Sequence, residues 1–134
     1  MNLWFADTFF FLALLKKDDE AHELATEIID ALHNGLVTTE WVLTEVADAL
    51  ASPIWRSHFV PLLDLLRNHP LITVVSSGGT LFDEGVRLYQ SRPDKHWSLT
   101  DCISFVVMKD RGMTHALTGD HHFEQAGFVA ILRR

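Results

Sequence analysis

Short runs of apolar residues alternate along the chain with longer stretches in which apolar residues recur every three or four positions. The short runs predict β-strands at 2–6, 36–38, 71–75, 113–117 and 128–132. The periodic stretches predict helices at 8–17, 21–33, 39–51, 53–66, 80–90, 98–109 and 121–126. In the stretch 21–33, for example, Leu24, Ile28 and Leu32 fall on one face of a helix. Strands and helices are therefore expected to alternate along the whole chain.

Turn-forming residues separate several of these elements. Asn34-Gly35 and Arg111-Gly112 end helices, and Thr118-Gly119-Asp120 forms a turn after the fourth strand. Short buried strands that alternate with helices are typical of parallel βαβ units with helices on both faces of the sheet. We therefore predict an α/β fold with a central parallel sheet of four to five strands. The length suits a single domain over residues 1–134, without an internal repeat or a linker.

The composition favours a folded, cytoplasmic protein. Hydrophobic residues make up 48% of the chain and include four Trp and nine Phe, which is enough for a core. The longest apolar run, Phe9–Leu15, is too short to span a bilayer, and the N-terminus lacks the pattern of a secretory signal. The single cysteine, Cys102, excludes an intramolecular disulfide and fits a reducing compartment. We expect Cys102 to be a core residue rather than a nucleophile.

The formal net charge of −7 argues against a protein that binds nucleic acid through Lys and Arg alone. An acidic chain can still act on nucleic acid if several carboxylates converge. Bound divalent cations then reverse the local charge and meet the phosphate. The positions of the acids therefore decide what the charge implies.

Four acids fall where the strands and helices predict a common location. Asp7 directly follows the first strand, Asp120 lies just past the fourth, and Asp101 begins a helix expected to dock at the same end of the sheet. Glu45 lies in the helix after the second strand. Ligand sites in open parallel sheets lie outside the carboxyl ends of the strands. We therefore expect these four side chains to meet there.

Each acid also has an ordinary structural interpretation. Asp7 and Asp120 suit the N-cap of a following helix, and Ser98 with Asp101 forms a pattern close to a capping box. Glu45 suits a solvated helix face, although it lies beside the apolar stripe that contains Val46. The functional interpretation therefore depends on all four acids together.

Hydroxyl groups accompany three of the acids, at Thr8, Thr100 and Thr118. Such hydroxyls orient carboxylates or hold water around a bound ion. Clusters of hard oxygen ligands suit Mg²⁺ or Mn²⁺ rather than zinc. Without an ion, four neighbouring carboxylates would repel one another and raise each other's pKa values. The set therefore predicts a Mg²⁺ or Mn²⁺ site.

With these residues the chain resembles the PIN domain family, and within it the small VapC-like ribonuclease toxins of toxin–antitoxin pairs. The matching segments, in order and nearly spanning the chain, are 5–8, 44–46, 98–105 and 116–128. The segments around Asp101 and Asp120 are the specific ones. One departure is Gly119, where many relatives carry a larger residue.

The resemblance implies a three-layer fold and hydrolysis of RNA phosphodiester bonds at a metal site of Asp7, Glu45, Asp101 and Asp120. Asp7, Asp101 and Asp120 are then the expected direct ligands, and Glu45 binds either directly or through water. The resemblance also implies a homodimer and an antitoxin whose peptide covers a groove near the site. A stand-alone RNA-processing nuclease and a binding module without turnover remain open alternatives.

Two further groups of residues are candidates for binding phosphate or for binding metal and transferring protons. Arg87, Arg92, Lys95 and His96 lead into the Asp101 helix and are candidates for holding flanking phosphates, although a solvated loop explains them equally well. His121-His122, next to Asp120, would suit zinc or a metal-free ribonuclease with histidine as acid and base. Adjacent side chains on a helix point about 100° apart, so we expect both rings only rarely to serve one ion.

Overall fold

The computed structural model describes residues 2–133, and strands and helices alternate in it as the sequence predicts. The strands are β1 (Leu3–Ala6), β2 (Gly35–Thr39), β3 (Ile72–Val75), β4 (His115–Leu117) and β5 (Val129–Ala130). The helices are α1 (Thr8–Leu15), α2 (His22–Asp30), α3 (Glu40–Ala49), α4 (Phe59–Asn68), α5 (Gly79–Ser91), α6 (Leu99–Asp110) and α7 (His121–Gln125), with a short 3₁₀ turn at Arg56–His58.

All strand pairings in the five-stranded sheet are parallel, in the order β3-β2-β1-β4-β5. Strand β1 is central, and its Trp4 pairs with Leu36 of β2 on one side and with His115 of β4 on the other. The carboxyl ends of the strands therefore lie at one edge, where the chain leaves β1 at Asp7. This arrangement places Asp7 in the middle of that edge.

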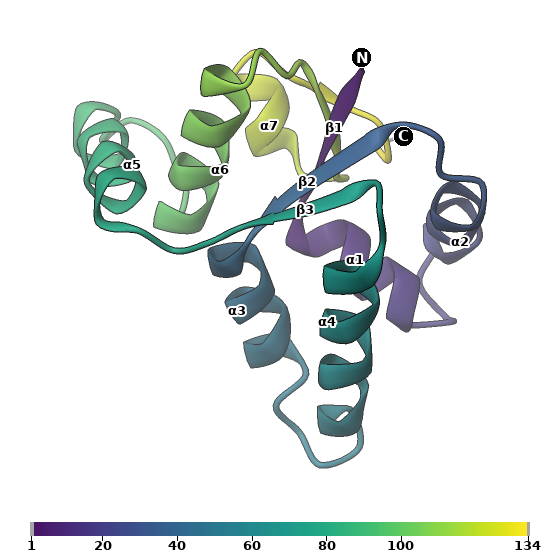
Figure 1. Cartoon of the computed structure of the whole chain (residues 1–134). Coiled ribbons are helices and arrows are strands. Elements are labelled where there is room, and N and C mark those ends of the chain that lie inside the picture. Colours follow the sequence, from purple (N-terminus) through teal and green to yellow (C-terminus); the bar gives the residue numbers. More distant parts are fainter. Residues whose placement is uncertain (1, 134) are drawn as a thin grey trace.

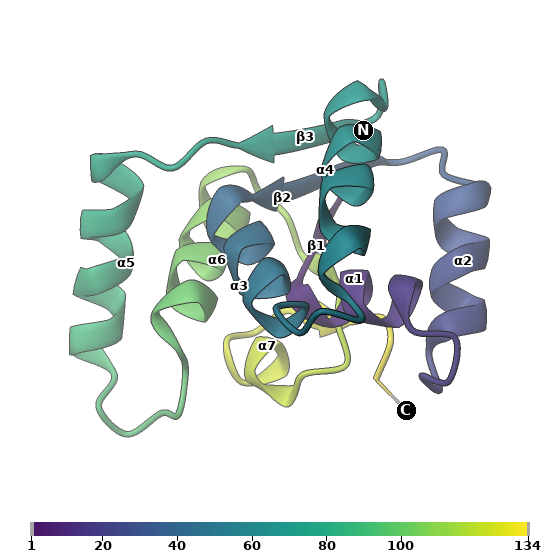
Figure 2. The ribbon, with the colours of Figure 1, turned by 90° about the horizontal axis from the view of Figure 1, so that it is seen from below.

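Helices cover both faces of the sheet. In Figure 1, α6 and α7 lie above the strands, whereas α1, α3 and α4 lie below them. Figure 2 shows the same layers from the side of α3 and α4, with α5 next to α6 at one end. The core between these layers is fully buried at Phe10, Phe11, Ile103, Met108 and Phe123, among others. The predicted three-layer α/β fold with a central parallel sheet is confirmed.

Helix α5 packs closely on α6 because residue 85 is a glycine. A Cβ atom at Gly85 would collide with the side chain of Ile103 on α6, so the two helices approach nearer than side chains would normally permit. Gly85 and Ile103 are both buried. This contact fixes α6, which carries Asp101 in its first turn.

The structure corrects the bounds of several predicted elements. Among them, the helix predicted at 21–33 ends at Asp30 as α2, and the strand predicted at 113–117 begins only at His115 as β4. Pro53 does not begin a helix: residues 53–58 form turns and the 3₁₀ segment, and α4 begins only at Phe59. Pro61 lies in the first turn of α4, where a missing N–H leaves no helical hydrogen bond unmade. The predicted strand 128–132 is reduced to Val129–Ala130, because β5 is the outermost strand of the sheet and pairs only with β4.

Within residues 2–133, no helix has the length and apolarity needed to cross a bilayer. Cys102 is fully buried on α6, and burial together with the nearby charge of Asp101 raises the pKa of its thiol to about 11. A buried, protonated thiol is a core group and a poor nucleophile.

Candidate functional site

Two buried threonines fix the carboxyl end of β2, one by a bond to β1 and the other by capping α3. Thr38 Oγ1 donates a hydrogen bond to the carbonyl oxygen of Ala6 (2.8 Å), and Thr39 Oγ1 accepts from the backbone N–H of Val42 (3.1 Å). Thr39 is thereby the N-cap of α3. These bonds set the start of α3 against the end of β1, so that Glu45 is directed towards the residues that follow Ala6.

Asp7 is the most buried of the four acids, with 5% of its surface exposed. Thr118 Oγ1 donates to Asp7 Oδ2 at 3.0 Å, linking the ends of β1 and β4. Burial raises the pKa of Asp7 to about 7, and the negative charges of Asp101 and Glu45 add to this rise. The hydrogen bonds from the Thr8 backbone and from Thr118 oppose it only in part. Asp7 is therefore a buried carboxyl group without full compensation for a negative charge.

Asp101 has a structural role and a place in the site at the same time. Ser98 Oγ accepts from the N–H of Asp101 (3.0 Å), and Asp101 Oδ2 accepts from the N–H of Ser98 (3.2 Å), which completes a capping box. Asp101 is only 7% exposed. Burial raises its pKa and the charge of Asp120 adds to the rise, whereas Ser98 and His122 lower it.

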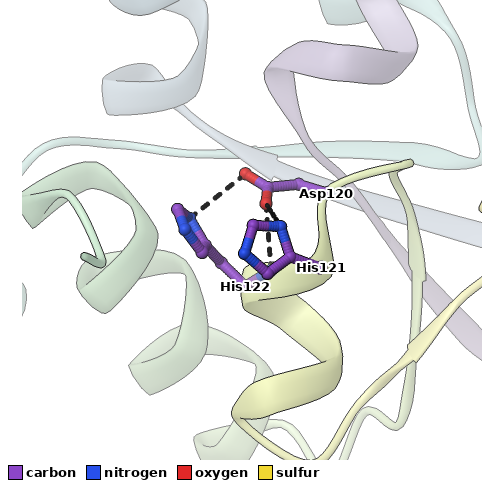
Figure 3. Close-up of side chains that lie close together, drawn as sticks. All are labelled: Asp120, His121 and His122. Atoms are coloured by element: carbon purple, nitrogen blue, oxygen red, sulfur yellow. Dashed lines mark hydrogen bonds and ion pairs between the residues drawn. The ribbon is translucent and has the colours of Figure 1, made fainter. Parts of the chain in front are cut away.

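Asp120 begins α7 and lies next to Asp101. Its Oδ1 accepts from the backbone N–H of His122 (2.9 Å), and its own N–H donates to Thr118 Oγ1 (3.0 Å). The ring nitrogen Nδ1 of His122 lies 3.2 Å from Asp101 Oδ2 and 3.4 Å from Asp120 Oδ2. Figure 3 shows His122 turned towards the Asp120 carboxylate. His122 therefore bridges acids that come from two different helices.

Glu45 joins the same group through Thr8. The Thr8 hydroxyl donates a hydrogen bond to Glu45 Oε1, and the charge of Glu45 contributes to the raised pKa of Asp7. Glu45 is half-buried, so it is not a freely solvated charge. The structure thus brings together all four acids singled out from the sequence.

Within the described residues, no Lys or Arg side chain forms an ion pair that balances the negative charge of this cluster. Within residues 2–133, the ion pairs of the four acids involve His121 and His122 but no Lys or Arg. Buried carboxylates without such partners are stabilised by a bound cation. The donor set of carboxylate oxygens therefore fits a divalent metal ion.

The hydroxyl groups expected around the site divide into two cases. Thr8 and Thr118 both hydrogen-bond to acids of the cluster. Within the described residues, Thr100 contributes its carbonyl oxygen, which accepts from Ser104 Oγ (2.9 Å), and its hydroxyl makes no such bond to an acid. Ser98 orients Asp101 instead. The sequence signal for Ser98 was its capping pattern, which identifies a helix start but not a site residue.

The sequence suggests His122 only as a zinc ligand or as a catalytic acid or base. It does not predict that His122 lies between Asp101 and Asp120. No sequence signal indicates that a residue two positions after Asp120 would also reach Asp101 on another helix. That contact depends on how α6 and α7 pack against each other.

The basic residues before α6 are only partly brought together. Arg92, Lys95 and His96 line a cavity of about 440 Å³ that Tyr89 and Trp97 also border, whereas Arg87 is exposed on α5 outside that lining. Arg92 makes two 3.0 Å hydrogen bonds to Asp94 and lies 5.3 Å from the centre of the Trp97 ring. Arg92 is therefore already paired, and Lys95 Nζ lies 4.0 Å from Oδ2 of the same Asp94 carboxylate.

Comparison with known proteins identifies one family and several similar structures. The PIN domain family model matches residues 5–129. VapC20 of Mycobacterium tuberculosis, described as a sarcin-ricin loop cleaving toxin, superposes with a TM-score of 0.85 at 25% identity, covering 97% of this chain and 98% of that one. No curated protein sequence matches the chain significantly.

Two further structures share the fold at lower identity. VapBC2 from Rickettsia felis, solved bound to a DNA fragment from its promoter, has a TM-score of 0.68 at 11% identity and covers 96% of each chain. FitAcB from Neisseria gonorrhoeae has a TM-score of 0.63 at 15% identity and covers 96% of this chain and 94% of its own. At these identities the likeness is one of fold.

Proposed function

Because the chain belongs to the PIN domain family, we propose that it is a Mg²⁺- or Mn²⁺-dependent endoribonuclease that acts in the cytoplasm as the toxin of a toxin–antitoxin pair. The observation that carries this proposal is the convergence of Asp7, Glu45, Asp101 and Asp120 at one sheet edge, with the pKa values of Asp7 and Asp101 raised by burial and by neighbouring negative charge. A fold alone hosts many functions, so the acids are the stronger argument.

Neighbouring side chains position the acids so that they could bind one metal ion together. Asp7, Asp101 and Asp120 would hold the ion, and Glu45 would complete its shell directly or through water. Thr118 keeps Asp7 and Asp120 in place, and Ser98 and His122 keep Asp101 in place. When bound, a divalent cation supplies activation of a water nucleophile and neutralisation of charge on the phosphate.

We place the RNA backbone along the cavity that precedes α6. Lys95 and His96 lie on this cavity, and the chain runs from them through Trp97 and Ser98 into the helix of Asp101. Cations here would contact phosphates that flank the cleaved bond. Arg87 is a weaker candidate because it lies outside the cavity lining, and Arg92 and Lys95 share the charge of Asp94, at 3.0 Å and 4.0 Å.

The toxin assignment rests on the similarity to VapC20, and a protein antitoxin and a homodimer are proposed on the family resemblance. The stand-alone RNA-processing nuclease and the silent binding module are the competing possibilities. Arrest of bacterial growth on expression, absent in Asp101→Asn, is expected of a toxin. Unchanged growth beside clear cleavage in vitro would favour the stand-alone nuclease.

The decisive experiment is cleavage of RNA with Mg²⁺ or Mn²⁺, mapped to the nucleotide. A sarcin–ricin stem-loop is the first substrate to test, since VapC20 is described as cleaving that loop. We expect products with 5′-phosphate and 3′-hydroxyl ends, loss of cleavage in EDTA, and a fall of at least about a hundredfold in Asp7→Asn and Asp101→Asn.

Asp110→Asn is the matched control, because Asp110 is exposed at the far end of the same helix, α6. It removes the same charge and should leave cleavage unchanged. Cleavage that persists in EDTA, or products with a cyclic phosphate, would contradict the metal-dependent reaction and favour histidine chemistry. A chain that binds RNA without cutting it under all these conditions would be the silent module.

A further inference from the structure

Two histidines flank the carboxylate of Asp120 at the start of α7. His121 Nδ1 lies 3.5 Å from Asp120 Oδ1, and His122 Nδ1 lies 3.4 Å from Asp120 Oδ2. One ligand atom from each of the three residues lies within 4.8 Å of the other two. Figure 3 shows both rings beside the carboxylate, with His122 to its left and His121 below it. A single cation would therefore find three donor groups already gathered.

Adjacent side chains on a helix are expected to point about 100° apart, yet the rings of His121 and His122 lie close together. Their centres are 4.5 Å apart. His121 lies beside Asp120 Oδ1 and His122 beside Asp120 Oδ2, so both rings contact the same carboxylate.

A fourth donor lies beside these three. Asp101 Oδ2 is 3.2 Å from His122 Nδ1. A cation held by His122 could therefore also take a carboxylate ligand from a second helix, α6.

We propose that Asp120, His121 and His122, with Asp101 beside them, form a second cation site that takes Zn²⁺ or a similar transition-metal ion in preference to Mg²⁺. Imidazole nitrogen favours such ions, whereas Mg²⁺ prefers oxygen alone. The side chain of His121 is 54% exposed and that of Asp120 is 31% exposed, which leaves the site open to entering ions.

Ion binding at this site does not depend on RNA cleavage. One consequence rests on the proposed function: zinc bound here would withdraw Asp101 and Asp120 from the four-carboxylate site. Zinc should therefore inhibit cleavage supported by Mg²⁺.

The test measures metal binding directly on the full chain. Zn²⁺ affinity is obtained by competition with a chromogenic chelator, and Co²⁺ serves as a spectroscopic probe whose visible absorption is intense when four ligands surround it. We expect about one tight equivalent, and a loss of Zn²⁺ affinity of at least about tenfold in His121→Gln and in His122→Gln. His121→Gln is the cleaner variant, because His121 contacts only Asp120 among the acids.

The control is His33→Gln, an exposed histidine just before β2, at the opposite edge of the sheet. It should keep Zn²⁺ affinity and the Co²⁺ spectrum, and circular dichroism should show all three variants folded. Equal Zn²⁺ affinity in wild type and in both site variants would overturn the inference. That result would leave the proposed ribonuclease intact if Asp101→Asn still abolished cleavage. Affinity that follows the two histidines in a chain that cuts no RNA would uphold the zinc site and contradict the ribonuclease.

Discussion

At the scale of single residues, Asp7 shows how the proposed site opposes the stability of the metal-free fold. Its carboxyl group is buried and faces Asp101 and Glu45, and its pKa rises to about 7. An acid whose pKa is higher in the folded state contributes nothing below its unfolded pKa of about 4, where both states are protonated. As the pH rises from about 4 to 7, the unfolded state loses this proton while the folded state still holds it, so the free energy of unfolding falls.

We therefore predict that Asp7→Asn stabilises the metal-free protein at pH 8. Asparagine still accepts the hydrogen bond from Thr118 but carries no charge. The gain in the free energy of unfolding should be on the order of 1–3 kcal/mol, falling to nothing near pH 4. Urea unfolding in EDTA at both pH values measures it.

The matched control for this prediction is Asp48→Asn, an exposed residue of α3 that carries the same charge. It should change the free energy of unfolding by less than about 0.5 kcal/mol. A destabilised Asp7→Asn variant at pH 8 would show that the Asp7 charge is compensated in the folded chain.

The packing of Phe9 explains why residue 119 is a glycine in this chain. A Cβ at position 119 would lie 2.5–2.9 Å from three carbons of the Phe9 ring, so Phe9 fills the space of a side chain there. The turn that carries Asp120 thus rests on an aromatic ring of α1. Phe9 and Gly119 are expected to act as a pair.

We predict that Gly119→Ala destabilises the protein by about 1–3 kcal/mol through overpacking and lowers cleavage by displacing Asp120. In the Phe9→Leu background, the same change should be nearly neutral, because the smaller side chain leaves room for the methyl group. A double-mutant cycle of unfolding free energies measures the coupling, which should exceed about 0.5 kcal/mol. Additive effects would show that the two positions do not interact.

At the scale of elements, helix α6 is held at the site by its first turn and by Gly85 of α5. The capping box satisfies the N–H groups of Ser98 and Asp101 and orients the Asp101 carboxylate at once. The stability of α6 and the proposed catalytic role of Asp101 therefore depend on the same two hydrogen bonds.

We predict that Ser98→Ala lowers the free energy of unfolding by about 1 kcal/mol and lowers cleavage as well, because Asp101 loses its fixed orientation. Ser91→Ala, at the end of α5, is the control: the Ser91 hydroxyl donates to Leu88 O in an exposed position away from the acids. It should leave cleavage intact. Full activity in Ser98→Ala would show that the capping box serves the helix alone.

At the scale of the whole molecule, the acid cluster joins β1, α3, α6 and α7 into one centre of negative charge. A bound ion would connect these elements and relieve the repulsion. An ion that binds the folded state alone at a hundred times its Kd adds about 2.7 kcal/mol.

Saturating Mn²⁺ should therefore raise the melting temperature of the wild type by roughly 5–10 °C. The rise should be much smaller in Asp101→Asn and unchanged in Asp110→Asn, as measured by thermal denaturation with and without EDTA. An equal rise in all three proteins would place the ion outside the cluster of acids.

The class of fold and the four acids could be predicted from local patterns in the sequence. Strand and helix periods are local properties of the chain, so the alternation of elements is readable before any tertiary contact is known. The N-cap positions of Asp7 and Asp120 and the capping box of Ser98 and Asp101 are also local, although the Asp7 side chain makes no capping hydrogen bond. Several boundaries, among them 53–58 and 128–132, were wrong, because turns and edge pairing depend on neighbours distant in sequence.

Only the tertiary structure decided how the acids interact. The order β3-β2-β1-β4-β5 brings residues from both ends of the chain together, so that Thr118 reaches Asp7 across 111 positions. The packing of α6 against α7 places His122 between Asp101 and Asp120, and the packing of α1 against the Asp120 turn requires Gly119. Such contacts follow from the positions of whole elements in space, and a local pattern of residues does not contain that information.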